Sequence, residues 1–441
     1  METKEENTKK RFVTLAENLD PQDSAMLQAL YSRSSDSVTT HLEKVREKGS
    51  GNFMNRFYVG YGHGSIGDCG TITLFIENVS ILAAKAIQDW PLYSGQETST
   101  RYIDMAKQPL EDPLKTQASS KLLKDWMDFY VKSQEPLKEY LRGVYPRQVD
   151  EEEKTYDKAL SARVFDTLRS FLPAGICTQL SWHTNLRQAA EKLALLNHHP
   201  LEEVRSIAEE ITEILKEKYP ESFSHKTYPE QEVYRAKISE LYTYYHNPSC
   251  PVFKCESKID SISLETYKEV LVKRPIKTNL PTFLSELGSC LCDFLLDYGS
   301  SRDAQRHRNG VFRMPLLTTE IGFHQWYLNE LSPELREKAL TLIETQVDII
   351  NKLEASLEIK QYYIPMGFLV SCRTTYSLPQ MVYVTELRSD KTVHPTYREV
   401  AHKMHQSLKD NFPYLTLYSD TDPSNWDIRR GKQDIALKEQ G

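Results

Sequence analysis

The densest group of basic side chains lies in one short segment of the second half of the chain, between Gly299 and Gly310 and just beyond. The planar guanidinium group of arginine suits phosphate and carboxylate, and glycine lets a backbone approach an anion closely. The segment therefore predicts a site for a phosphate-bearing ligand, with a solvated loop or an ion-pair network as the alternative. Its basic residues are Arg302, Arg306, His307, Arg308 and Arg313.

A second polar group is the run ETSTRY at residues 97–102, in the first half of the chain. It brings together the carboxylate of Glu97, the hydroxyls of Ser99 and Thr100, and the guanidinium of Arg101. Side chains of these types could hold the phosphate and the sugar of a nucleotide. The alternative is a capped turn, in which Glu97 and Ser99 bind only the local backbone.

The sequence lacks the signatures of several common enzyme classes. It contains no G-x-G-x-x-G after a strand, no G-x-x-x-x-G-K-[ST] and no G-x-S-x-G, which disfavours a Rossmann dehydrogenase, a Walker ATPase and an α/β-hydrolase. Seven cysteines are thinly spread, a pattern that predicts reduced thiols in an intracellular protein. Neither Cys250 with Cys255 nor Cys290 with Cys292 has the second pair that structural zinc needs, so no metal site is expected.

Composition and charge limit the classes of partner. The 441 residues are 39% hydrophobic and 27% charged, as in ordinary globular proteins. A net charge of −7 argues against a protein that coats nucleic acid or an anionic membrane. The N-terminus has no apolar signal region and no window approaches 18 apolar residues, so a cytoplasmic protein without a membrane span is predicted.

Landmarks in the two halves recur at a nearly constant spacing. Prolines that flank helices are separated by 365 − 173 = 192, 395 − 200 = 195 and 413 − 220 = 193 residues. An internal repeat of this kind indicates two homologous units in one chain. We predict a first unit at residues 1–222 with a polar N-terminal tail, a polar linker at 223–262 and a second unit at 263–441.

Hydrophobic patterning predicts that helices dominate each unit. We expect an α+β unit repeated twice, each copy a small sheet with several helices. Helices are predicted at about 116–142, 154–172, 201–218 and 396–409, and short strands around 57–62, 72–82 and 290–298.

The two polar groups resemble two parts of one signature. The flavin-dependent thymidylate synthases, the ThyX family, carry R-H-R-x-x-S-x-N-E-x-S-x-R-Y as one continuous run. Here R-H-R stands at 306–308, whereas the later part of the run is matched at 94–102. Each half has kept what the other has lost, and the resemblance implies two tandem ThyX-like repeats that form an internal pseudo-dimer with one composite site.

Other family elements are divided in the same way. The upstream H-x-S/T-x-x-E resembles the first-half segment at 63–68, where Asp68 replaces the glutamate. An arginine before the Leu-Pro pair and an N-x-R element after it are matched by Arg169, Asn185 and Arg187. The last family arginine is matched by Arg388 in the second half, whereas its first-half counterpart is Leu196.

The resemblance implies a function and a set of roles. The function is reductive methylation of dUMP to dTMP, an FAD-dependent methyltransferase reaction with NADPH and methylenetetrahydrofolate as co-substrates. Arg388 is implied as the catalytic residue that polarises the uracil. The implied dUMP contacts are Glu97, Ser99, Thr100, Arg101, Arg169, Arg306 and Arg388. The implied FAD contacts are His63, Ser65, Asp68, Asn185, Arg187, Arg306, His307 and Arg308.

Two alternatives to this function stay open. One is a related flavin and folate enzyme that modifies a pyrimidine differently, for example by hydroxymethylation. The other is a nucleotide-binding paralogue without turnover. Asp303 stands where the family has a glutamine, which bears on which pyrimidine is bound. Family members are tetramers, so a chain with two repeats implies a homodimer.

Overall fold

The computed structural model describes residues 14, 16, 18–101 and 103–424. Most of the predicted N-terminal tail, Tyr102 and residues 425–441 of the predicted second unit lie outside the described residues. Helices combine with two small sheets, which confirms the α+β class. The chain divides into two compact units: the first comprises Met1–Thr73, His183–Ala194 and Ala208–Pro229, and the second comprises Leu74–Trp182, Leu195–Ile207 and Glu230–Gly441.

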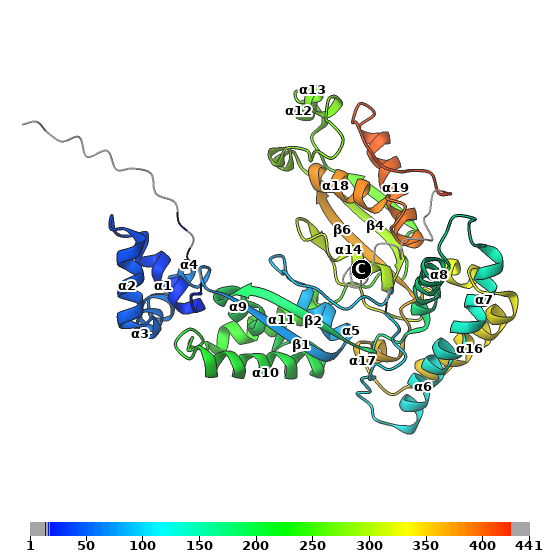
Figure 1. The fold of residues 1–441 in the computed structure, drawn as a ribbon, viewed down its shortest axis with the longest axis horizontal. Helices are drawn as coiled ribbons and strands as arrows, with labels where there is room; N and C mark the ends of the chain where they lie inside the picture. Colours follow the sequence, from blue (N-terminus) through cyan, green and yellow to red (C-terminus); the bar gives the residue numbers. More distant parts are fainter. Residues whose placement is uncertain (1–13, 15, 17, 102, 425–441) are drawn as a thin grey trace, which may run out of the picture. The chain divides into compact units, whose positions relative to one another are not determined.

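The first unit begins with short helices, coloured blue in Figure 1. Asp20 caps α1 (Pro21–Tyr31), because its Oδ1 accepts the amide of Gln22 at 2.9 Å and proline at the first position needs no partner. Met26 and Leu27 of this helix pack against Val45. The other helices that begin here are α2 (Val38–Lys48), α3 (Gly51–Phe53), η1 (Met54–Gly60), α4 (Gly64–Gly67) and α9 (Leu186–Leu196), whereas α10 (Glu202–Lys218) begins in the second unit and ends in the first.

The strand predicted around 57–62 is wrong, since Met54–Gly60 is helical. The aromatic residues here recur every fourth position, which places them on one helical face. The ring centroids of Phe53 and Phe57 lie 4.8 Å apart, and those of Phe57 and Tyr61 lie 5.8 Å apart. This stacking favours a helix over the extended conformation that aromatic content alone suggested.

The second unit contains a four-stranded sheet in the order β3-β4-β6-β5. Its strands are β3 (Phe253–Ser257), β4 (Ser289–Asp297), β5 (Val311–Phe312) and β6 (Leu369–Ser377), all paired antiparallel. Buried Phe294 pairs with buried Cys372 at its centre. Helices α18 (Leu378–Arg388) and α19 (Pro395–Asn411) pack on this sheet (Figure 1).

A short helix directly follows each of two strands, β1 (Thr71–Ser80) and β4. β1, paired with β2 (Cys177–Asn185), leads into α5 (Ile81–Gln88), and Ser80 Oγ caps that helix. β4 leads into α14 (Tyr298–Ala304), which Asp297 caps. The remaining elements are α6 (Gln117–Lys132), α7 (Gln134–Val144), α8 (Glu153–Leu168), η2 (Arg169–Phe171), α11 (Pro229–Tyr242), α12 (Ser261–Glu265), α13 (Lys268–Val272), η3 (Thr282–Leu287), α15 (Gln325–Asn329), α16 (Pro333–Lys352), α17 (Leu357–Lys360) and η4 (Gln361–Tyr363).

The segments that follow η2 and η4 lie side by side and exchange backbone hydrogen bonds in matching pairs. The amide of Ala174 donates to Ile364 at 2.9 Å, and the amide of Met366 donates to Leu172 at 2.9 Å. The donors are 366 − 174 = 192 residues apart, and so are the acceptors, 364 − 172. This is the contact pattern of two segments related by a local two-fold axis. A second pair of hydrogen bonds has the same offset. The amide of Gly175 donates to the carbonyl of Tyr362, and the amide of Gly367 donates to the carbonyl of Ser170.

The expectation that all cysteines are reduced is wrong for one pair. Cys255 on β3 and Cys292 on β4 are direct cross-strand neighbours and form a disulfide. They lie 37 residues apart in the sequence, so only the strand register brings them together. Among the described residues no helix is long and apolar enough to cross a membrane, and no cluster of metal-ligand side chains occurs.

Candidate functional site

A cavity of about 830 Å³ in the second unit collects arginines from three distant segments. Ser99 and Arg101 come from the loop after α5, Arg306 follows α14, and Arg388 ends α18. Guanidinium groups that converge in this way suit an anionic ligand. The other lining residues are Ile276, Lys277, Thr278, Asn279, Asp303, Tyr383, Glu386, Leu387, Asp390, Thr392, Val393 and Tyr418.

Arg388 is held by two acceptors, one from His307 and one from Asp303. Its Nε donates to Nε2 of His307 at 2.8 Å, and its Nη2 donates to the carbonyl of Asp303 at 3.1 Å. Burial and the charge of Arg388 lower the pKa of His307 to about 3. The imidazole is therefore neutral at physiological pH, and its Nε2 is free of a proton and accepts the bond. His307 orients Arg388 and is itself buried.

Arg101 is held by a buried carboxylate. Its Nε lies 2.8 Å from Oδ1 of Asp166, and its Nη2 donates to Oδ2 at 3.5 Å. The nearby Arg169 is buried, and its Nη2 donates to Ser300 Oγ at 2.9 Å. Arg169 therefore supports the wall and does not line the cavity.

Glu97 lies in a buried ion-pair group with Lys85 and Arg302, here called the buried triad. Its Oε2 is 2.6 Å from Lys85 Nζ, and its Oε1 is 2.6 Å from Arg302 Nη2. Burial raises the pKa of Glu97, but the charges of Arg302 and Lys85 outweigh burial and lower it to about 2. Burial lowers the pKa of Lys85 to about 8. Thr100 is buried beside the triad and accepts a bond from Arg302 at 3.2 Å.

The low pKa of Glu97 predicts acid-sensitive stability. A carboxyl whose pKa falls from 4.5 unfolded to about 2 folded stabilises the protein above pH 4.5 and loses that contribution as the pH falls to 2. The loss is about (4.5 − 2) × 1.36, or roughly 3 kcal/mol. We therefore expect the stability difference between wild type and Glu97→Gln to shrink between pH 7 and pH 3. Urea unfolding across this range measures it, and a difference that stays constant would contradict the assignment.

Five of the implied FAD contacts lie in the first unit. Arg187 Nε is 2.8 Å from Asp68 Oδ1, and Asn185 Oδ1 accepts the amide of Gln188 at 2.8 Å at the start of α9. His63 immediately precedes α4, and Ser65 lies within it. The side chain of Arg187 is 35% exposed, so it keeps N–H groups accessible to a ligand.

Arg308 and Arg306 lie in the second unit. The guanidinium of Arg308 stacks over the ring of Tyr93 at 4.7 Å, and its Nε donates to the carbonyl of Gln88 at 3.4 Å. The side chain of Arg306 is 51% exposed and lies 3.4 Å from Asp303. Arg306 is therefore the more accessible of the two.

The structure thus separates the implied dUMP contacts into two groups. Ser99, Arg101, Arg306 and Arg388 line the cavity, whereas Glu97, Thr100 and Arg169 are buried behind it. Sequence reasoning missed Lys85 and Asp166. Lys85 had a signal, because it is the one charged residue in the apolar helix ILAAKAIQ. Asp166 had none, since α8 carries several charged residues.

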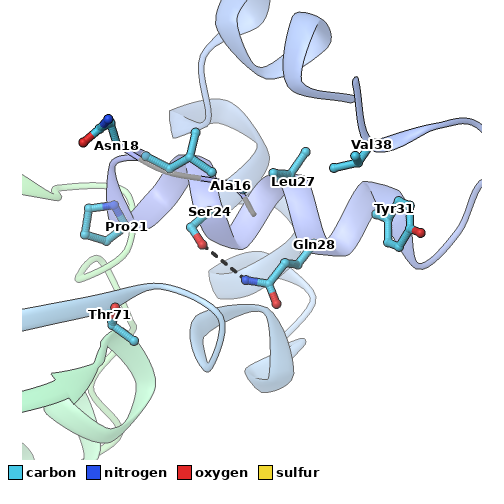
Figure 2. Close-up of a pocket in the computed structure, with 10 residues that line it drawn as sticks. Ala16, Asn18, Pro21, Ser24, Leu27, Gln28, Tyr31, Val38 and Thr71 are labelled. Atoms are coloured by element: carbon cyan, nitrogen blue, oxygen red, sulfur yellow. Dashed lines mark hydrogen bonds between the residues drawn. The ribbon is translucent and has the colours of Figure 1, made fainter. Parts of the chain in front are cut away.

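A second cavity, of about 380 Å³, lies in the first unit beside α1 (Figure 2). Its walls combine apolar side chains such as Leu27 and Val38 with Ser24 and Gln28, which are joined by a hydrogen bond of 3.2 Å. None of the ten described residues that line it is charged. The arginine-lined cavity is therefore the better candidate for an anionic ligand.

Fold and site together define an α+β protein with an arginine-lined cavity. Residues 14–221 match the model of the family described as thymidylate synthase complementing protein, which confirms the family resemblance inferred from the sequence. A UPF0159 protein of Chlamydia muridarum is 25% identical over 88% of this chain and 84% of its own length. One of Thermoplasma acidophilum is 24% identical over 89% of this chain and 94% of its own length. The match supports a function related to thymidylate synthase.

Proposed function

We propose that this chain is a flavin-dependent thymidylate synthase that methylates dUMP at one composite site. The observation that carries the proposal is the cavity on which Arg101, Arg306 and Arg388 converge. These arginines lie up to 388 − 101 = 287 residues apart in the sequence. Their convergence agrees with a family signature that is divided between the two halves.

Each residue of the cavity has a distinct task in this proposal. Arg101 and Ser99 bind the phosphate of the nucleotide by charge-assisted hydrogen bonds. Arg388 donates to a carbonyl oxygen of the pyrimidine and stabilises negative charge that develops on the ring. His307 and the Asp303 carbonyl hold Arg388 in place, so little reorganisation is needed when that charge forms.

The exposed arginines fit an FAD diphosphate, whereas His307 does not. The side chain of Arg306 is 51% exposed and keeps free donors for phosphate oxygens. His307 is buried, and its Nε2 is engaged by Arg388. We therefore propose Arg306, with Arg308, as the residues of the second unit that would hold FAD. The flavin would supply the reducing hydride, with NADPH and methylenetetrahydrofolate as co-substrates.

Residues at corresponding positions of the two halves support a single site per chain. At an offset of 192, Leu196 corresponds to Arg388, and Gln361 corresponds to Arg169. The matched hydrogen bonds after η2 and η4 support this offset and the tandem repeat. We propose that the two repeats form a pseudo-dimer and that two chains associate as a homodimer.

Activity on labelled dUMP tests the function directly. We expect the purified protein to show a flavin absorption spectrum and to release tritium from 5-labelled dUMP only when NADPH and methylenetetrahydrofolate are present. The mass of the product distinguishes methylation from hydroxymethylation. A colourless protein that binds dUMP without releasing tritium would instead identify a non-catalytic nucleotide-binding paralogue.

A further inference from the structure

The carboxylate of Asp303 lies among the arginines of the cavity. Its Oδ1 is 3.4 Å from Arg306 Nε, and its own backbone carbonyl accepts a bond from Arg388. Its side chain is only 13% exposed, so solvent screens it poorly. Asp303 therefore lies where an anionic ligand would meet the same guanidinium groups.

The groups that face Asp303 come from several elements and are mostly cationic. Burial raises the pKa of Asp303, but the surrounding arginines hold it well below its usual range. Asp303 is thus ionised before any ligand binds. The facing charged and titratable groups are Arg101, Arg169, Arg306, His307, Arg388 and Tyr397.

Two other carboxylates on the cavity wall are engaged differently. Glu386 pairs with Arg274, and Asp390 Oδ1 accepts the amide of Thr392 at 2.8 Å. Asp303 is consequently the carboxylate of the three that shares cationic neighbours with an incoming anion.

A phosphate monoester creates a conflict with this carboxylate. Its second pKa is about 6, so it is mostly a dianion above neutral pH. Two anionic groups that share one set of cations repel, and such pairs retain a proton to higher pH than either group alone. The complex therefore holds one proton that the free ester lacks.

We infer that Asp303 selects for the charge of the ligand and couples the binding of a phosphate monoester to the uptake of one proton. This inference rests on the proposed function, which places the nucleotide phosphate on Arg101, one of the arginines whose charge acts on Asp303. Asp303 acts as a specificity-determining residue, and the wild-type cavity binds the monoanionic form of the ester better than the dianion.

Isothermal titration calorimetry of the full chain tests the inference, with dUMP, inorganic phosphate and deoxyuridine as probes. Titrations at pH 6 to 8, in two buffers of different ionisation enthalpy, count the protons taken up. For wild type we expect nearly one proton per dUMP at pH 8 and an affinity that falls about tenfold per pH unit. For Asp303→Asn we expect about tenfold or greater tightening at pH 8 and proton uptake near zero. Deoxyuridine, which lacks the phosphate, should show neither effect.

Further variants guard against indirect effects. Asp303→Gln should reproduce the result of Asp303→Asn, whereas Asp390→Asn, which removes a charge elsewhere on the same wall, should give less than half the gain. Circular dichroism checks that each variant is folded. If both Asp303 variants bind no tighter than wild type and take up as many protons, the inference is wrong.

Two outcomes separate this inference from the proposed function. If inorganic phosphate shows the gain in Asp303→Asn while dUMP does not bind, the role of Asp303 stands and the nucleotide function fails. If neither phosphate nor dUMP binds to wild type or to any variant, the arginine-lined cavity is no anion site, and both are refuted.

Discussion

Replacement of Arg388 by alanine should lower kcat for tritium release from labelled dUMP by about 100- to 1000-fold, the usual cost of removing one preorganised donor. The flavin content should not change, because the contacts of Arg306 with Asp303 Oδ1 and of Arg308 with Tyr93 do not involve Arg388. Arg388→Lys should recover only part of the rate, since lysine keeps the charge but cannot bond to His307 and the ligand with one planar fork.

Arg313→Ala is the matched control for this experiment. Arg313 belongs to the same basic segment of the sequence but stacks over Tyr242 and Tyr245 at 5.7 Å and is not among the residues that line the cavity. Its loss should change kcat by less than about twofold. Full activity of the Arg388→Ala variant would contradict the proposal of a composite site.

Replacement of Glu97 by glutamine should lower the free energy of unfolding at pH 7 by about 3–5 kcal/mol. The substitution leaves Lys85 and Arg302 buried without a counter-charge. Chemical denaturation monitored by circular dichroism measures the loss. The result separates a structural role of Glu97 from the dUMP contact that the resemblance implies, because a simple ligand contact would change affinity and leave stability nearly intact.

A second substitution tests whether the loss arises from the triad. Glu97→Gln combined with Lys85→Met removes one of the two uncompensated cations and should recover part of the stability. Glu334→Gln, which removes an exposed ion pair with Lys338 on α16, should cost no more than about 0.5 kcal/mol. If Glu97→Gln costs no more than Glu334→Gln, the triad does not stabilise the fold.

Hydrophobic periodicity predicted several of the longer helices, because a helical face repeats within a few residues, but it missed others such as α16. The helices at 154–172, 201–218 and 396–409 correspond closely to α8 with η2, α10 and α19. The prediction of a strand at 57–62 was wrong, because the aromatic residues there fit either a strand or a helix until their stacking is known. The domain boundaries and the tandem repeat remain predictions.

For the candidate site, the sequence predicted which residues take part better than it predicted which side chains contact one another. Arg101 and Arg388 were identified from motif spacing, and both line the cavity. Spacing could not reveal that Glu97 would be buried against Lys85, because their pairing depends on how the loop after α5 folds back on that helix. The disulfide between Cys255 and Cys292 was missed for a similar reason, since strand register is a tertiary property.

The matched hydrogen bonds after η2 and η4 also constrain how the chain folds during synthesis. The segment at 170–175 cannot make these bonds until the segment at 362–367 has been made, about 190 residues later. At 5–20 residues per second this delay is roughly 10–40 seconds. During that time the first half presents an unsatisfied backbone edge, and Trp126 lacks the carbonyl of Tyr363 to which its indole donates. Completion of this backbone pairing therefore waits until the second half of the chain has been synthesised.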